Sequence, residues 1–395
     1  IDPLTGEEVV EFIMHLDTYG EAMDVDLTDS VMVVAANYKG FIIYDIVRDS
    51  QGNIQTVDSV FNNSNMDDGM GDNRAQKVAI SQNHEIAFIT DIYDRIWVWK
   101  LADGAVQYED GIANYTYDCY GGTWLSTAID DQDDHVKVFS LVQHISAEVD
   151  TTENNQDFDQ YSTSVVWEGL YDLGLGDAQL ETNASPKCEF SYNFGILPKA
   201  IDFSDGLLAV SNGELGVNVL KQTDEVLCLD DENNMIPDSL LPPLWPTGNV
   251  DADREVCIAD GYVGDGEGNY VPGANGNYEP AGGFYPYLYS SFDLPGETNA
   301  VLVRESAIFA GLSTSNGCYM SLLDSNGSVN HKLSLANGYT INAISEDNGT
   351  IALSAGHDGV LLYKWFGDLS DYPAVLFMGH IHTPYSNNVR VDGNN

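Results

Sequence analysis

A short acidic stretch near the middle of the chain, "DDENNMIPD", carries the side chains best suited to hold a metal ion. Asp230, Glu232 and Asn234 stand at alternate positions, and Asp238 follows as a later acid. This spacing lets several side-chain oxygens converge on one hard cation, and oxygen is the ligand that calcium prefers. The stretch therefore predicts a calcium site, with a solvated acidic loop as the alternative.

The same stretch is similar to the calcium repeats of thrombospondin type 3, in which "DGIPD" is usual. Met235 stands where those repeats have the Gly that a tight turn needs. The resemblance implies calcium as a cofactor. Farther along the chain, "GDGEGN" offers Asp265, Glu267 and Asn269 as further candidate ligands.

Aromatic residues are frequent in the same region, among Gly, Asn and Pro. Tyr and Trp rings bury a large area at little entropic cost and commonly stack sugars or grip peptides. They predict a ligand-binding surface, unless the loop uses them only to pack onto the rest of the fold. The residues are Trp245, Tyr262, Tyr270, Tyr278, Tyr285, Tyr287 and Tyr289.

Five cysteines lie at positions 119, 188, 228, 257 and 318, and their spacing fits no tight zinc pattern. Cys228 and Cys257 bracket the acidic loop and are the best candidates for a disulfide. That bond requires an oxidising compartment. An odd number of cysteines leaves one unpaired.

Three other patterns indicate structure more than chemistry. Acidic clusters at 67–72 and 130–134 are expected in turns, where solvated carboxylates are commoner than cation sites. "GHIH" puts His380 and His382 on one face of a strand, but no third metal ligand is evident. "TYDCYGGTW" resembles the Asp-box of sialidase propellers with one extra residue, yet a sialidase needs an arginine cluster and this chain is poor in Arg.

The chain has 62 Asp and Glu against 15 Lys and Arg, a net charge of −47. Such a field repels nucleic-acid backbones and anionic lipids, which argues against both as partners. No apolar run is long enough for a membrane helix, so direct membrane insertion is not expected. An acidic surface suited to salty water is the simplest cause of the charge, and cations are the natural partners.

One pattern recurs six times: an alternating strand, a polar turn, an apolar strand ending in small residues, a second turn and a third alternating strand. Most copies leave room for a fourth strand, such as 53–60 or 328–335. Four antiparallel strands recurring roughly every 40 to 50 residues are typical of β-propeller blades. The predicted fold class is all-β, a β-propeller of six to seven four-stranded blades with two long loop insertions. The copies span 22–46, 75–101, 114–141, 199–221, 299–324 and 341–365.

Two of these copies share a more specific order of residues. Ala36 through Asp45 and Ser354 through Tyr363 both read as small residues, turn, Gly, alternating strand, and Tyr or Asp. This order resembles the LVIVD-type repeats of bacterial cell-surface propellers, although copies two and three lack the Gly. The resemblance implies an extracellular or cell-surface protein and leaves its biochemical role open.

The whole chain, 1–395, is predicted to form one propeller domain. Two stretches, 142–198 and 222–297, are longer than a fourth strand requires and are predicted to be insertions. Long loops inside a compact domain are usually functional, so a site is expected there.

The two ends of the chain read alike. "VEFIMHL" at 10–16 and "VLFMGHI" at 375–381 each fit a fourth strand. "NNVRVDGNN" at 387–395 then fits the opening of a seventh blade. This favours a native chain that continues past Asn395 over a ring that closes with six blades.

Together these features favour a secreted or surface-displayed propeller that acts as a binding, adhesion or assembly module. Calcium would stabilise it, and a protein or glycan at the cell surface would be its partner. One alternative is a polysaccharide-acting hydrolase or lyase with its acid and base in the central funnel, which paired carboxylates with shifted pKa values would favour. Another is a purely structural subunit of a larger surface assembly.

Overall fold

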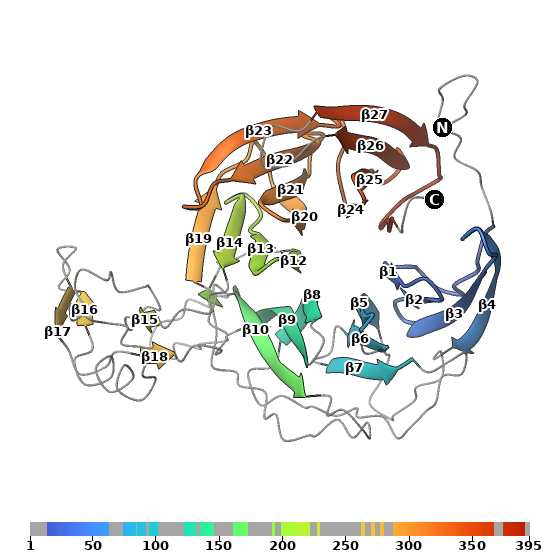
Figure 1. Ribbon diagram of the computed structural model, residues 1–395, viewed down its shortest axis with the longest axis horizontal. Coiled ribbons are helices and arrows are strands. Elements are labelled where there is room, and N and C mark those ends of the chain that lie inside the picture. Colours follow the sequence, from blue (N-terminus) through green and yellow to red (C-terminus); the bar gives the residue numbers. More distant parts are fainter. Residues whose placement is uncertain are drawn as a thin grey trace, which may run out of the picture.

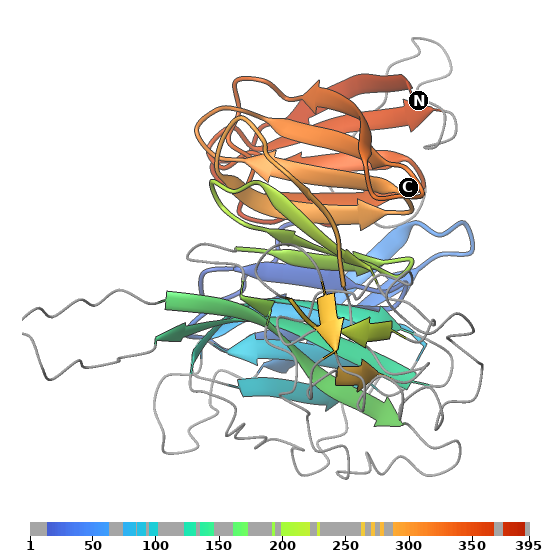
Figure 2. The same ribbon diagram turned by 90° about the vertical axis from the view of Figure 1, so that its left-hand side faces the viewer.

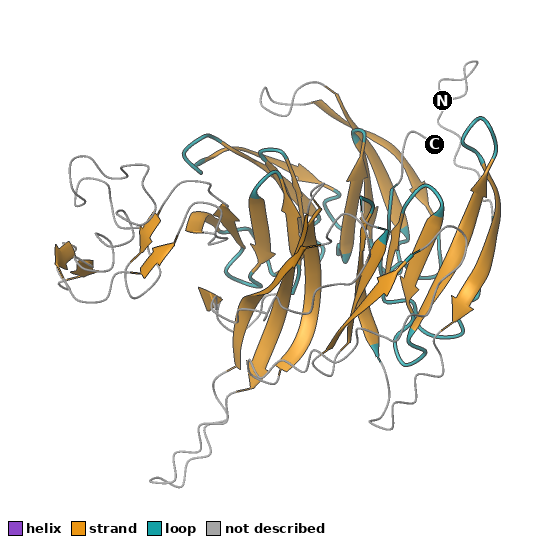
Figure 3. Ribbon diagram, turned by 60° about the horizontal axis from the view of Figure 1, so that its bottom comes forward, coloured by secondary structure: helices purple, strands orange, loops and turns teal. Residues whose placement is uncertain are grey.

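In the residues that it describes, the computed structural model contains strands, turns and connections and no helix (Figure 3). Consequently no helix suited to crossing a bilayer occurs in the part of the chain that it describes. The described residues are 14–62, 74–83, 85–91, 95–101, 122–131, 135–145, 161–172, 192–193, 199–221, 227–229, 262–264, 270–272, 277–279, 287–366 and 374–391.

Six antiparallel sheets follow one another around a central axis, and each runs outward from an inner strand (Figure 1). We call these sheets blades 1 to 6 in chain order. Five have four described strands and blade 2 has three. Such a ring of sheets defines a β-propeller, so the predicted fold class is confirmed.

The strands take equivalent places from blade to blade. The inner strands are β1 (Asp24–Leu27), β5 (Ala75–Ser81), β8 (Gly122–Asp131), β12 (Ile201–Ser204), β20 (Thr298–Arg304) and β24 (Ala343–Asp347). The second strands are β2 (Val31–Ala35), β6 (Ile86–Asp91), β9 (His135–Ile145), β13 (Leu207–Ser211), β21 (Ala307–Leu312) and β25 (Thr350–Ser354). The third strands are β3 (Phe41–Arg48), β7 (Arg95–Lys100), β10 (Tyr161–Asp172), β14 (Val217–Lys221), β22 (Cys318–Leu323) and β26 (Val360–Phe366). The fourth strands are β4 (Ile54–Asn62), β11 (Tyr192–Asn193), β19 (Tyr287–Phe292), β23 (Val329–Leu335) and β27 (Ala374–Ile381).

Tight turns join the inner strand to the second strand, and their residues suit that geometry. Asp205 and Gly206 have φ values of 51° and 76°, and Asn348 and Gly349 have values of 48° and 78°. Two consecutive positive φ values give a hairpin turn whose twist matches that of the strands. The Asp-Gly and Asn-Gly pairs therefore fix the register of the first hairpin in blades 4 and 6.

The apolar core lies mainly between neighbouring blades. Phe309 and Met320 of blade 5 pack with Leu353 and Leu361 of blade 6, and all four are buried. Equivalent clusters join blades 1 and 2, 3 and 4, and 4 and 5. Because full burial of one such side chain contributes roughly 1.5–3 kcal/mol, stacking of blade on blade is a major source of stability.

The meander of each blade sends its strands back and forth between the two faces of the ring (Figure 2). The turns between second and third strands therefore lie on the same face as the connections from one blade to the next. We call this the turn face. Its described segments are 17–23, 36–40, 212–216, 293–297, 313–317, 336–342, 355–359 and 382–385.

Several predicted fourth strands are confirmed. The expected strands at 53–60, 328–335 and 375–381 correspond to β4, β23 and β27. In blade 3, however, the copy predicted to hold the first three strands contributes only β8 and most of β9. The third strand, β10, lies within 142–198, because a long connection separates it from β9 and breaks the regular spacing.

The range 222–297 also contains regular structure. It includes β19, the fourth strand of blade 4, and two short pairs of strands. β15 (Leu227–Leu229) pairs with β18 (Asn277–Glu279), and β16 (Tyr262–Gly264) pairs with β17 (Tyr270–Pro272).

The Gly that precedes the third strand of blade 6 has two physical reasons to be Gly. Gly359 has a φ of +82°, and a Cβ atom there would lie 2.2 Å from the carbonyl oxygen of Ile381 in the fourth strand. Gly338 also has a positive φ, +97°, but a Cβ atom there would meet nothing within 4 Å. Substituting Ala at each position therefore separates the cost of a positive φ, which both share, from the cost of a backbone clash, which only Gly359 has.

We expect Gly359→Ala to lower the free energy of unfolding by at least about 1–2 kcal/mol more than Gly338→Ala does, because only the first adds a clash to the strain of a positive φ. Urea unfolding of both variants measures the difference. Equal losses in the two variants would show that close approach of the third and fourth strands is not what requires Gly359.

Candidate functional site

The inner strand is the edge of each blade, so every second main-chain N–H of this strand faces away from its own sheet. At the boundary of blades 1 and 2, aspartates accept these N–H groups. Val78 donates its N–H to Asp24 Oδ2 at 3.0 Å, and Ile80 donates to Asp26 Oδ2 at 2.8 Å. Side chains of one inner strand thus accept hydrogen bonds from the otherwise unpaired N–H groups of the next inner strand.

The same arrangement recurs at three other boundaries, with serine as an alternative acceptor. We call each bond of this kind a rung. The further rungs are Ile201 N–H to Ser126 Oγ at 3.3 Å, Val303 N–H to Asp202 Oδ2 at 2.7 Å, and Val391 N–H to Ser345 Oγ at 2.9 Å.

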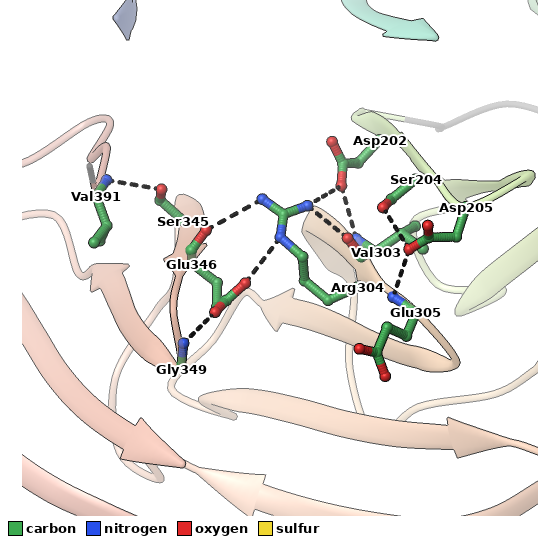
Figure 4. Close-up of polar contacts among 10 residues, drawn as sticks. All are labelled: Asp202, Ser204, Asp205, Val303, Arg304, Glu305, Ser345, Glu346, Gly349 and Val391. Carbon is green, nitrogen blue, oxygen red and sulfur yellow. Dashed lines mark hydrogen bonds and ion pairs between the residues drawn. The ribbon is translucent and has the colours of Figure 1, made fainter. Parts of the chain in front are cut away.

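Arg304 links three blades next to these rungs (Figure 4). Its Nε atom lies 2.9 Å from Glu346 Oε2 in blade 6, and its Nη1 atom lies 3.6 Å from Asp202 Oδ2 in blade 4. Glu346 Oε1 also accepts the N–H of Gly349 at 2.6 Å. The planar guanidinium can hold two carboxylates at once, which a lysine ammonium does less well.

Burial raises the pKa of the Asp24, Asp26 and Asp202 carboxyls above their ordinary value of 3.8. Lys77 opposes this rise at Asp24, Arg390 at Asp26 and Arg304 at Asp202. Raised pKa values at carboxylates also occur at catalytic sites, so this observation alone does not separate catalysis from structure. The rungs do provide a structural role for all three residues.

The turn face carries several exposed aromatic and acidic side chains. Four large side chains are mostly exposed there: Tyr19 (64%), Tyr38 (57%), Leu215 (60%) and Tyr385 (54%). Tyr19 lies in the segment before blade 1, Tyr38 and Leu215 lie in turns of blades 1 and 4, and Tyr385 lies in the segment after blade 6. Exposed acids, among them Glu21, Glu214 and Asp358, lie in the same turns and connections.

The histidines of blade 6 also lie at this end of the sheet. The rings of His380 and His382 are 3.9 Å apart between centroids, and the ring of His357 lies 4.7 Å from that of Tyr385. Among the residues that the structure describes, no group of three or more His, Cys, Asp or Glu is placed to hold a metal ion. The two histidines of "GHIH" were predicted on one face of a strand; their rings do lie side by side, but His382 follows β27.

Most of the predicted metal and ligand residues lie outside the described residues: Asp230, Glu232, Asn234, Asp238, Asp265, Glu267, Asn269, Trp245, Tyr285 and Cys257. Tyr262 and Tyr270 lie in the paired strands β16 and β17. Tyr278 and Cys228 are directly opposite each other in β18 and β15. The calcium site, the aromatic surface and the disulfide therefore stay predictions.

The remaining candidates have clearer outcomes. Tyr289 donates its hydroxyl hydrogen to the carbonyl oxygen of Asp324 at 2.7 Å, which ties β19 to blade 5. Cys318 is buried and free, and burial raises the pKa of its thiol to about 12.

Asp130 and Asp131 were expected in a solvated turn but lie in β8, where Asp130 is buried. Asp131 Oδ1 accepts the hydroxyl hydrogen of Ser81 at 2.7 Å, so it joins blades 2 and 3.

Sequence reasoning missed the rung residues. The signal was present, because Asp24, Asp26 and Asp202 stand in otherwise apolar strands, "MDVDL" and "AIDFS". A carboxylate in such a strand needs a buried partner. The partner here is the main chain of the neighbouring blade, which side-chain motifs do not reveal.

Comparison with known proteins gives likeness of fold only. No protein family and no curated protein matches this sequence. The WD40 repeats of RRP9 share 11% identity at a TM-score of 0.48, over 93% of this chain and 83% of theirs. U3-55K shares 12% sequence identity at a TM-score of 0.46, over 93% of this chain and 84% of that chain. A third similar structure is Sqt1 of Chaetomium thermophilum bound to the N-terminus of the ribosomal protein L10. It shares 9% sequence identity at a TM-score of 0.45, over 87% of this chain and 72% of that chain. The assignment of this chain to the β-propellers rests on its own ring of blades.

The raised pKa of Asp202 has a testable consequence for stability. A carboxyl whose pKa is higher in the folded than in the unfolded state contributes stability below its unfolded pKa, and this contribution is lost as pH rises through the folded pKa. Asp202→Asn keeps an oxygen acceptor for Val303 and does not titrate. We therefore expect the stability of Asp202→Asn, relative to the parent protein, to rise between about pH 4 and about pH 7.

The matched variant is Asp202→Ala, which also removes the acceptor and leaves a buried N–H unpaired. We expect it to be less stable than Asp202→Asn by about 1–3 kcal/mol at both ends of this pH range. Urea unfolding at several pH values measures both effects. Equal stability of the Ala and Asn variants would contradict the rung.

Proposed function

We propose that this propeller is a binding and assembly module that presents its turn face to a protein partner. The observation that carries the proposal is the exposure of Tyr19, Tyr38, Leu215 and Tyr385 on that one face. Tyrosine is enriched in protein interfaces because its ring buries area with few rotatable bonds while its hydroxyl still finds a hydrogen-bond partner.

The fold fixes the main chain that carries two of these side chains. Tyr38 lies in a turn closed by main-chain hydrogen bonds from Ala36 to Gly40 and back from Lys39 to Ala36. Leu215 lies in the equivalent turn of blade 4, which has the corresponding bonds. Anchors held by such turns lose little further entropy on binding, and this favours affinity.

Charge indicates the chemistry of the partner. The chain carries a net charge of −47, and acids such as Glu21, Glu214 and Asp358 are exposed on the turn face. Of the nearby lysines, Lys199 is engaged at 2.5 Å by Glu297. A partner with basic residues around apolar pockets fits this face, because opposite charge speeds association and excludes acidic competitors.

The proposal also includes a cellular location, the cell surface, and a cofactor, calcium. The LVIVD-like order of residues supports an extracellular or cell-surface adhesion protein, and the acidic loop at 230–238 supports stabilisation by calcium. A protein partner is favoured over a glycan because the exposed tyrosines come from three separate segments of the chain, 17–23, 36–40 and 382–385. The support for calcium and for location is the sequence pattern.

A second candidate function is hydrolysis or cleavage of a polysaccharide at the inner strands. The raised pKa values of Asp24, Asp26 and Asp202 favour it, because a general acid must hold its proton near neutral pH. Against it, each of these carboxylates accepts an N–H from the next blade. A general acid with its oxygens committed to the main chain is poorly placed to reach a glycosidic oxygen.

Replacing the exposed rings tests the proposed face. We expect the double variant Tyr19→Ala/Tyr38→Ala to lose at least about tenfold in affinity for basic peptides selected from a peptide array, since anchor residues carry most of the energy of an interface. The matched control is Val47→Ala/Val60→Ala, which truncates exposed side chains of β3 and β4 in the same blade. Fluorescence anisotropy measures both; an equal loss in the control, or no binding at all, would contradict the proposal.

Calcium stabilisation is tested separately. We expect calcium to release heat on titration and to raise the melting temperature, because a ligand bound only by the folded state stabilises that state. The variant Asp230→Asn/Asp238→Asn should abolish both effects. Absence of heat and of any shift with chelator would remove calcium from the proposal and leave the turn face untouched.

A further inference from the structure

Two histidines lie side by side where the outermost strand of blade 6 reaches the turn face. His380 stands in β27, and His382 follows the end of that strand at Ile381 (Figure 1). Their ring centroids are 3.9 Å apart, and the ring planes are inclined by 45°. His380 is half-buried and His382 is exposed. Solvent and small solutes therefore reach the pair from the side of His382.

The main chain beneath the pair is held against the turn between the second and third strands of blade 6. Ala355 donates its N–H to the carbonyl oxygen of Gly359 at 2.7 Å, and Gly359 donates to Gly356 at 3.1 Å, which closes this turn. A Cβ atom at Gly359 would lie 2.9 Å from the N atom of Thr383 and 3.3 Å from the Cα atom of His382. The segment after β27 thus packs directly on a closed turn.

The ring of His380 is held in one orientation by two contacts. Its Nε2 atom contacts the carbonyl oxygen of Asp358, and its edge packs on the ring of Tyr339 with 6.2 Å between centroids. A carbonyl oxygen can only accept a hydrogen bond, so Nε2 carries the hydrogen and Nδ1 carries the free lone pair. Histidines that bind metals commonly donate their second ring N–H to a backbone carbonyl in this way.

We propose that His380 and His382 chelate a divalent transition-metal ion. The Nδ1 atom of His380 supplies one lone pair, and a ring nitrogen of the exposed His382 supplies the second. Imidazole nitrogens bind zinc at about 2.0–2.1 Å. Rings whose centroids are only 3.9 Å apart can present one nitrogen each to a single ion after a modest rotation of His382.

The donor set indicates which ions fit. Imidazole suits copper, zinc and nickel, whereas calcium and magnesium prefer oxygen ligands. Among divalent first-row ions, copper(II) binds a given nitrogen site most tightly. The net charge of −47 also concentrates cations near the surface. The pair should therefore prefer copper(II) over zinc and should ignore calcium.

Two protein ligands make a different kind of site from a closed structural centre. In the described part of the chain, no third His, Cys, Asp or Glu joins the two histidines in a metal-binding group. Water or a group from another molecule then fills the remaining positions, as the open position of catalytic zinc sites does. The bound ion is consequently exchangeable. This inference rests on neither the proposed protein partner nor the proposed calcium.

The test titrates the 395-residue chain with Cu²⁺ in the presence of excess Ca²⁺, which occupies oxygen-rich sites. We expect one bound copper ion whose electron paramagnetic resonance spectrum shows coupling to two imidazole nitrogens. His382→Gln should weaken this binding at least about tenfold, since even loss of an outer-shell partner costs a metal site that much. His382 is exposed, so the metal-free melting temperature should change little in this variant.

His357→Gln is the matched control. His357 is exposed in the same turn as Asp358, but its ring lies 4.7 Å from that of Tyr385, and its Nδ1 atom lies 3.3 Å from the carbonyl oxygen of Pro384. Copper affinity should change less than about twofold in this variant. The proposal is overturned by absence of the two-nitrogen spectrum, by undiminished affinity in His382→Gln, or by equal losses in both variants.

Discussion

The free edge of the inner strand is the constraint on which the rest of this propeller depends. In a sheet that starts at the axis, the innermost strand has one row of N–H groups without a partner in its own blade. A buried N–H left unpaired costs about 1–3 kcal/mol, and the ring repeats the problem at every blade. Asp24, Asp26 and Asp202 solve it with a carboxylate, and Ser126 and Ser345 with a hydroxyl.

This solution places negative charge where burial makes it costly. Burial raises the pKa of all three aspartates, so the few cations of the chain matter more than their number suggests. Arg304 pairs with Asp202 and Glu346, and Arg390 pairs with Asp26. Removing one partner of such a pair leaves an uncompensated charge, which is why these arginines are structural residues of the ring.

Alternation and turn chemistry were enough to predict the blades. Copies such as 341–365 gave three strands and their turns, because Asn348-Gly349 and Gly359 are local signals with local causes. Blade 3 shows the limit of this reasoning. Its third strand lies beyond a long connection, and nothing in residues 114–141 says which strand is inner. The likeness of the two chain ends predicted the opening of a further blade at 387–395; the described part, 387–391, forms no strand, but Val391 there donates its N–H to Ser345 as the rung residues do.

The surface that we propose for binding was harder to predict. The sequence directed attention to the acidic and aromatic loops, whereas the turn face gathers Tyr38 and Leu215 from two copies and Tyr19 from the segment before the first copy. Each of these residues is unremarkable in its own segment. Only the closure of blades into a ring puts them on one surface, so no local pattern could show it.

The most direct test of the central claim is native-state hydrogen exchange of the rung amides of Val78, Ile80, Ile201 and Val303. If side chains of the preceding blade hold these edge groups, their exchange is as slow as that of second-strand amides in the same blades. In Asp202→Ala the Val303 amide should then exchange faster while that of Ile80 stays slow. Fast exchange of all four amides in the parent protein would contradict the account, because the inner strands would then be free edges.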